Sequence, residues 1–150
     1  MTSRIPLFKA KSLGFERDMA SFSIKYGTLP NFTASAIVDT GCPYIIISES
    51  QIKKTRIPYK DKPSLAKPLS LGKIALELKD LGICEIFFRD EDNKTIAYKE
   101  SIYVGIPINL SQGDILIQQL PSFIGKEFLD KNYLSVIKAR DNKTYLHVIE

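Results

Sequence analysis

The stretch Ala36-Ile37-Val38-Asp39-Thr40-Gly41 decides how the rest of this 150-residue chain is interpreted. Its three apolar residues have the character of a buried strand, yet an ionisable carboxylate follows them directly. Unpaired buried charge is costly, so Asp39 needs a structural or a chemical reason to be there. Gly41 allows a sharp turn, and the short hydroxyl of Thr40 can lock that turn. Asp39 is therefore either a turn residue that caps its own loop or a reactive group.

Short apolar runs separated by turn residues surround this stretch, which is typical of strands in a small barrel or sandwich. Hydrophobic residues make up 44% of the chain and charged residues 25%, as in an ordinary globular domain, so we expect one domain over residues 1–150. A helix and a loop are expected within 49–68, and a short helix over 126–134. The predicted strands are Ser21–Tyr26, Phe32–Val38, Tyr44–Ile47, Ile74–Leu78, Cys84–Phe88, Thr95–Val104, Ser135–Arg140 and Thr144–Ile149.

A second motif, Phe123-Ile124-Gly125, lies far downstream and directly precedes the predicted C-terminal helix. The order of Ile37-Val38-Asp39-Thr40-Gly41, then Ile45-Ile46-Ile47-Ser48, then Phe123-Ile124-Gly125 resembles the retropepsin-like aspartic proteases. The resemblance covers residues 20–150. It implies an all-β fold, a closed or partly open small β-barrel with one short C-terminal helix.

The resemblance also implies the site and the assembly. Asp39 would be the catalytic residue, with Thr40, Gly41, Ile124 and Gly125 supporting the active-site loop. Gly125 would be needed because its backbone packs against that loop without room for a side chain. Members of the family with one such motif per chain complete their site from two chains, so we expect a homodimer acting on a peptide or protein substrate. No metal and no organic cofactor are expected.

Retropepsin-like proteases cover their substrate with a β-hairpin flap. The candidate here lies within residues 63–78, with Leu69, Ser70, Leu71 and Gly72 near its tip, and it is poorer in glycine than many flaps of the family. The segment 105–121 is longer than a minimal retropepsin needs, and it is either a loop particular to this chain or part of the interface. Residues 1–20 are expected to be an N-terminal extension or an interface strand.

Cys42 and Cys84 are too few for a disulfide framework or a zinc site. Cys42 follows the Asp-Thr-Gly motif, where it is either a small buried apolar residue or a thiol whose oxidation disturbs the site. Cys84 and His147, the only histidine, are read as structural.

The net charge of +4 is concentrated in residues 53–73, where seven basic residues face only Asp61. Three interpretations remain open: a solvated loop, a surface for an acidic partner, and a nucleic-acid groove. The third is disfavoured because Tyr59 is the only aromatic residue there. No apolar run is long enough to cross a membrane, and the first residues lack the apolar core of a signal peptide, so a cytoplasmic protein is expected.

The preferred function is therefore an aspartic endopeptidase that hydrolyses peptide bonds as a homodimer, with one Asp39 from each chain activating a shared water. The alternative is a catalytically inactive module of the same fold that serves dimerisation or peptide binding. An inactive form would most simply have lost the aspartate, so its presence favours the enzyme.

Overall fold

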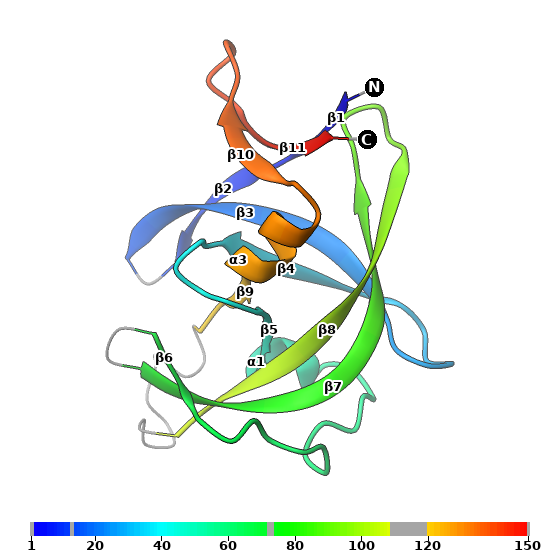
Figure 1. Ribbon diagram of the computed structural model, residues 1–150, viewed down its shortest axis with the longest axis vertical. Coiled ribbons are helices and arrows are strands. Elements are labelled where there is room, and N and C mark those ends of the chain that lie inside the picture. Colours follow the sequence, from blue (N-terminus) through cyan, green and yellow to red (C-terminus); the bar gives the residue numbers. More distant parts are fainter. Residues whose placement is uncertain (1, 13, 72–73, 109–119, 150) are drawn as a thin grey trace.

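The structure is a computed structural model that describes residues 2–12, 14–71, 74–108 and 120–149. It is mostly β, as expected from the sequence (Figure 1). The predicted helices are found within 49–68 and after Gly125. In chain order the elements are β1 (Thr2–Pro6), β2 (Phe8–Ser12), β3 (Phe15–Lys25), β4 (Phe32–Val38), β5 (Ile45–Ser48), α1 (Glu49–Ile52), β6 (Leu69–Leu71), β7 (Ile74–Arg89), β8 (Thr95–Pro107), β9 (Ser122–Ile124), α3 (Lys126–Lys131), β10 (Ser135–Lys138) and β11 (Thr144–Ile149).

The strands of the described residues form two sheets. Eight of them follow the order β2-β3-β4-β9-β5-β8-β7-β6, and β3 also pairs with β7, so the strands from β3 to β7 form a ring of pairings. The second sheet has the order β1-β11-β10. The mostly β class is confirmed, whereas full closure into a barrel stays a prediction.

The long strand β7 unites two segments for which the sequence predicts separate strands, 74–78 and 84–88. Between these segments Gly82 lies in a bulge with φ of 81°. The Asp80 carboxylate accepts a 2.7 Å hydrogen bond from the Gly82 amide, and the register with β8 shifts between Asp80 and Ile83. The chain therefore continues in the same strand after the bulge.

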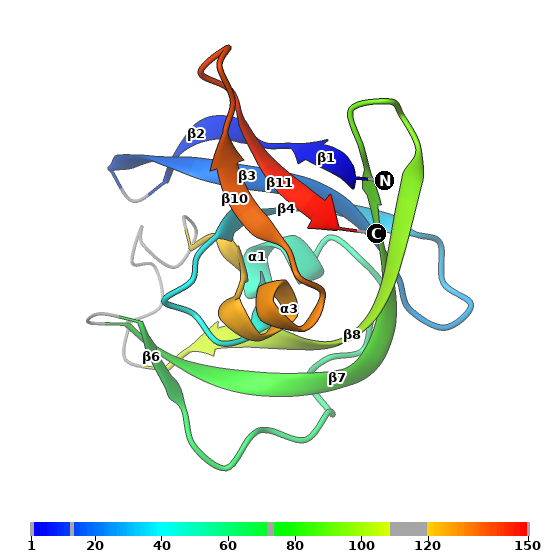
Figure 2. The same ribbon diagram turned by 45° about the horizontal axis from the view of Figure 1, so that its top comes forward.

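Aromatic side chains fix the C-terminal helix against the sheets. The Phe88 ring stacks on Phe22 at 5.3 Å and on Phe128 of α3 at 6.0 Å. Tyr98 meets Phe128 edge to face at 5.1 Å. In Figure 2 α3 lies in front of the strands, and of its residues only Phe128 and Leu129 are buried. Because Phe128 and Leu129 anchor α3 to the core, the residue that precedes the helix, Gly125, has a defined position.

The N-terminal strands are integrated into the fold. β1 pairs antiparallel with β11, and β2 pairs antiparallel with β3. Arg4 of β1 makes two hydrogen bonds, of 2.9 and 2.7 Å, to the Glu91 carboxylate in the β7–β8 turn. The N-terminal segment is thus tied both to the C-terminus and to the longest hairpin. In the part of the chain that the structure describes, no helix has the length and apolar character needed to span a membrane.

The β7–β8 turn contains a polar cluster that the sequence predicts to be solvated, Asp90-Glu91-Asp92. The prediction is wrong for Asp90, which is buried. Its carboxylate accepts hydrogen bonds from the amides of Asp92 at 2.9 Å and Lys94 at 2.8 Å. The turn folds around this side chain, because an Asp carboxylate can satisfy amides that the strands leave unpaired.

Candidate active site

Asp39 directly follows β4, and its backbone extends the pairing of β4 with β9 by one residue. Its amide donates a 3.0 Å hydrogen bond to the Ile124 carbonyl, and its carbonyl accepts one of 3.2 Å from the Cys42 amide. The Gly41 amide donates to the Asp39 carboxylate at 2.8 Å. The chain thus turns directly after the strand and aims one of its own N–H groups at the carboxylate. A half-buried carboxylate held in this way keeps a fixed orientation.

The loop that carries Asp39 connects two strands with β9 between them. β9 runs parallel to β4, with Val38 opposite Ile124, and antiparallel to β5, with Ile46 opposite Phe123. The Phe123-Ile124-Gly125 motif therefore lies directly behind the Asp-Thr-Gly loop, although more than eighty positions separate them in the sequence. Parallel pairing of this kind leaves no trace in the periodicity of either strand.

Gly125 makes the tightest approach to this loop. A Cβ placed on it would lie 2.4 Å from the Cys42 carbonyl oxygen and 2.5 Å from both the amide nitrogen and the carbonyl oxygen of Tyr44. All three atoms are backbone, so no side-chain movement could relieve the clash. Any larger residue would have to push the loop away from β9.

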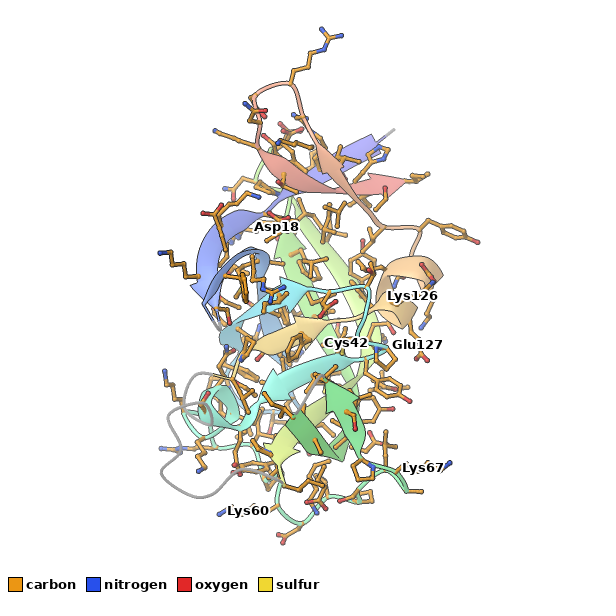
Figure 3. The ribbon with its side chains drawn as sticks, turned by 90° about the vertical axis from the view of Figure 1, so that its left-hand side faces the viewer. Asp18, Cys42, Lys60, Lys67, Lys126 and Glu127 are labelled. Carbon is orange, nitrogen blue, oxygen red and sulfur yellow. The ribbon has the colours of Figure 1, made fainter. Side chains whose placement is uncertain are left out.

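The start of α3 holds the loop from a second side. The Lys126 amide donates to the Cys42 carbonyl at 2.7 Å, and the Glu127 amide donates to the Pro43 carbonyl at 3.1 Å. Figure 3 shows Cys42 and Glu127 beside each other at this junction. Two amides at the start of the helix, which have no partner inside it, are thereby satisfied by the loop.

The structure brings Asp39, Thr40, Gly41, Ile124 and Gly125 into one cluster. Ile124 is fully buried, whereas Thr40 and Gly41 lie exposed at the surface of the single chain. The turn of the cluster, Thr40-Gly41, therefore faces solvent, and the residues that support it, Ile124 and Gly125, lie inside the fold. Among the described residues, no group of three or more His, Cys, Asp or Glu side chains is placed to hold a metal ion.

The flap candidate forms a hairpin with the start of β7. Leu69, Ser70 and Leu71 make up β6 and pair with Leu76, Ala75 and Ile74 respectively. Gly72 lies outside the described residues, as does most of the segment 105–121. A role of this hairpin in covering a substrate stays a prediction.

Sequence reasoning missed an apolar hollow beside the site, of about 50 Å³. Strand β5, which follows the Asp39 loop, and strand β9, which packs behind it, supply one side of the hollow, and the β6–β7 hairpin supplies another. The alternation of Ile74, Leu76 and Leu78 was the signal that one face of this hairpin is apolar. The hollow is lined by Ile46, Ser48, Leu71, Ile74, Leu76, Gly105, Leu120, Pro121 and Phe123.

Cys42 is fully buried directly below the loop. Burial raises the pKa of its thiol to about 11, the contact with the Tyr44 carbonyl lowers it, and the nearby Asp39 carboxylate raises it further. A thiol that stays protonated at neutral pH is a poor nucleophile. The structure favours the small apolar residue over the redox-sensitive thiol.

The sequence matches no protein-family model and no curated protein. Among solved structures the chain is similar to a retropepsin-like aspartic protease from Rickettsia conorii, with a TM-score of 0.53 and 14% identity, over 99% of this chain and 92% of that one. It is also similar to the EIAV protease complexed with the inhibitor HBY-793, with a TM-score of 0.48 and 10% identity, over 85% and 98%. The retroviral protease-like domain of Ddi1 from Leishmania major gives a TM-score of 0.41 and 9% identity, over 85% and 93%.

An Asp-Thr-Gly turn held by a strand between its two flanking strands, in a mostly β chain, defines the class of fold. The chain has a retropepsin-like fold. At this level of identity the similarity concerns the fold alone.

Proposed function

We propose that the protein is an aspartic endopeptidase that works as a homodimer. The observation that carries the proposal is the presentation of Asp39, whose carboxylate is half-buried and oriented by the Gly41 amide at the surface of the chain. A carboxylate that served only as a turn cap would not need the loop to be clamped by both β9 and α3. The clamp at Gly125 instead fixes the position of the carboxylate, as shared-site chemistry requires.

The proposed reaction uses Asp39 from each of two chains. Two carboxylates held about 3 Å apart share one proton, because like charges at that distance cannot both ionise. The ionised member accepts a proton from a bound water, whose oxygen attacks the scissile carbonyl carbon. The protonated member donates to the developing oxyanion. Collapse of the tetrahedral intermediate breaks the C–N bond, and a proton passes to the leaving amine.

The apolar hollow supports a peptide substrate with an apolar side chain near the scissile bond. Residues of β5 and β9, the strands that follow and support the Asp39 loop, line it together with the β6–β7 hairpin, so an extended peptide passing Asp39 would lie along it. Burial of an aliphatic side chain there would contribute about 1–2 kcal/mol to binding. We propose that Leu69, Ser70 and Leu71 belong to the hairpin that covers this peptide.

The decisive experiment compares the parent protein with Asp39→Asn, which keeps the size of the side chain and removes its charge. We expect the parent to cleave an unfolded protein such as casein at some pH between about 3 and 7, and the variant to be inactive. Equal cleavage by both preparations would reveal a contaminant. A lack of cleavage by the parent at every pH would favour the alternative, a module for dimerisation or peptide binding without turnover.

A further inference from the structure

A second hollow, of about 450 Å³, lies between the β3–β4 turn and the segment that follows α1. In Figures 1 and 2 the β3–β4 turn projects to the right, whereas the loop that carries Asp39 lies on the left. The hollow is therefore separate from the candidate active site. We call it the basic hollow; its lining is Leu29, Pro30, Asn31 and Phe32 from the turn and Lys54, Thr55, Arg56 and Ile57 from the segment after α1.

The floor of the basic hollow is apolar. Leu29 and Phe32 are half-buried and pack against the main core, and Ile57 belongs to that core. An apolar floor that remains open to solvent can gain free energy by taking up an apolar side chain. A loop that is merely solvated would not require an open apolar floor.

Both walls of the basic hollow are held by local hydrogen bonds. The Leu29 amide donates to the Tyr26 carbonyl at 3.1 Å, which closes the β3–β4 turn. On the other wall the Thr55 hydroxyl donates to the Ile52 carbonyl at 2.7 Å and accepts from the Ile57 amide at 3.2 Å. Thr55 stands between Lys54 and Arg56, so the backbone that presents these two cations is already ordered. A partner would not have to meet the cost of ordering it.

The rim of the basic hollow is positively charged and unneutralised. Lys54 and Arg56 are exposed, as is the adjacent Lys53, and within the described residues none of the three forms an ion pair. Among the described residues, no acidic side chain lines the hollow. The carboxylate of Glu49 in α1 is engaged by the Tyr59 hydroxyl at 2.7 Å. Lysines continue along the chain beyond the rim, and Figure 3 shows Lys60 and Lys67 projecting outwards.

We propose that the basic hollow docks an acidic segment of a partner protein, with one apolar side chain on the floor and carboxylates beside Lys54 and Arg56. Complementary charge would steer and orient the segment, and the planar Arg56 guanidinium can bind a carboxylate through two hydrogen bonds. A nucleic acid fits less well, because single strands need exposed aromatic rings for stacking. Tyr59 is buried with its hydroxyl engaged, and Phe32 is part of the floor.

Binding can be tested independently of catalysis in the Asp39→Asn protein, so that failure of the proposed protease activity does not affect the result. The probe is a short fluorescent peptide in which one leucine is flanked by glutamates, followed by anisotropy at low salt. We expect binding that weakens as salt rises. The double variant Lys54→Glu/Arg56→Glu should bind at least about 10-fold more weakly. The matched control Lys138→Glu/Arg140→Glu, which makes the same charge change in the β10–β11 hairpin, should bind within about 2-fold of the parent.

Replacement of the peptide's leucine by serine should weaken binding about 5-fold, since the floor then loses its contact. Three results would overturn the proposal: an equal loss of affinity in the two double variants, equal affinity for the serine and leucine peptides, or no binding by the parent protein. So would tighter binding of an oligothymidine than of the peptide, which would indicate a nucleic-acid surface. If the unfolding midpoint shows that the Lys54/Arg56 variant is misfolded, Asn31→Glu on the opposite wall serves instead, with the same weakening expected.

Discussion

At the scale of single residues, Gly125 and Gly105 are both buried, but they differ in what surrounds them. Backbone atoms at 2.4–2.5 Å would oppose a Cβ on Gly125, whereas a Cβ on Gly105 would meet side-chain methyl groups, Ile46 Cγ2 at 2.8 Å and Leu76 Cδ1 at 3.2 Å. Side-chain methyl groups can shift at a smaller cost than paired backbone can. We expect Gly125→Ala to lower the free energy of unfolding by about 3 kcal/mol and Gly105→Ala by about 1 kcal/mol.

Urea titrations with a common slope would measure this difference between the two alanine variants. Equal losses would show that the loop yields to a Cβ on Gly125 as easily as side chains yield to one on Gly105, and would contradict the clamp. Gly125→Ala should also move the Asp39 loop. We therefore expect its cleavage activity to fall by more than its fraction of folded protein does.

The buried thiol of Cys42 leads to a second prediction at this scale. Its pKa of about 11, against an ordinary value of 9.0, leaves about 100-fold less thiolate at pH 8 than in the unfolded chain. In a Cys84→Ala protein, we expect iodoacetamide to modify native Cys42 at least about 100-fold more slowly than in guanidinium. Mass spectrometry of timed samples would measure both rates. A modification rate in the native protein close to that in the unfolded chain would favour the interpretation of Cys42 as a redox-sensitive thiol.

The same shift has a consequence for stability. The folded form holds the Cys42 proton more tightly than the unfolded form does. Burial of this thiol therefore makes its full contribution to the free energy of unfolding below pH 9. This contribution should be lost as the pH rises from 9 towards 11, because ionisation of the thiol then stabilises the unfolded chain. A Cys42→Ala protein should lack this part of the alkaline decline in the urea midpoint.

At the scale of elements, the β7–β8 turn depends on Asp90. This buried carboxylate accepts from two backbone amides, and Asn93 beside it adopts a φ of 65°. Asp90→Ala should destabilise the fold by about 2 kcal/mol, because two amides lose their partner. Asn93→Gly should be close to neutral, since glycine accepts that φ without strain. Thermal unfolding of the two variants checks this, and equal shifts would mean that the turn is held by the strands alone.

Elements built from neighbouring residues could be predicted from the sequence. The β4 strand before Asp39 and the two strands of the β10–β11 hairpin were predicted from apolar runs separated by turn residues. The pairings that shape the site were not, because β9 joins β4 and β5 across most of the chain. β1 escaped prediction for the same reason, since it finds its partner in β11. Family resemblance, rather than periodicity, linked Asp39 with Gly125.

At the scale of the whole molecule, one chain carries one Asp-Thr-Gly turn, exposed at its surface. The proposed chemistry needs two copies of Asp39, so activity should depend on pairing of chains. When parent and Asp39→Asn proteins are mixed in equal amounts and allowed to exchange, about half of the parent chains acquire an inactive partner. Each parent chain should then lose about half of its activity. A single-chain site would lose none.

The matched control for this mixing experiment is Asp92→Asn, which makes the same chemical change at an exposed position in the β7–β8 turn. It should leave the activity of the parent unchanged in the mixture. Sedimentation velocity at the assay concentration should show a dimer, and specific activity should rise with protein concentration as dimers form. Activity that stays proportional to parent protein, from a species that sediments as a monomer, would contradict a shared active site while leaving the fold intact.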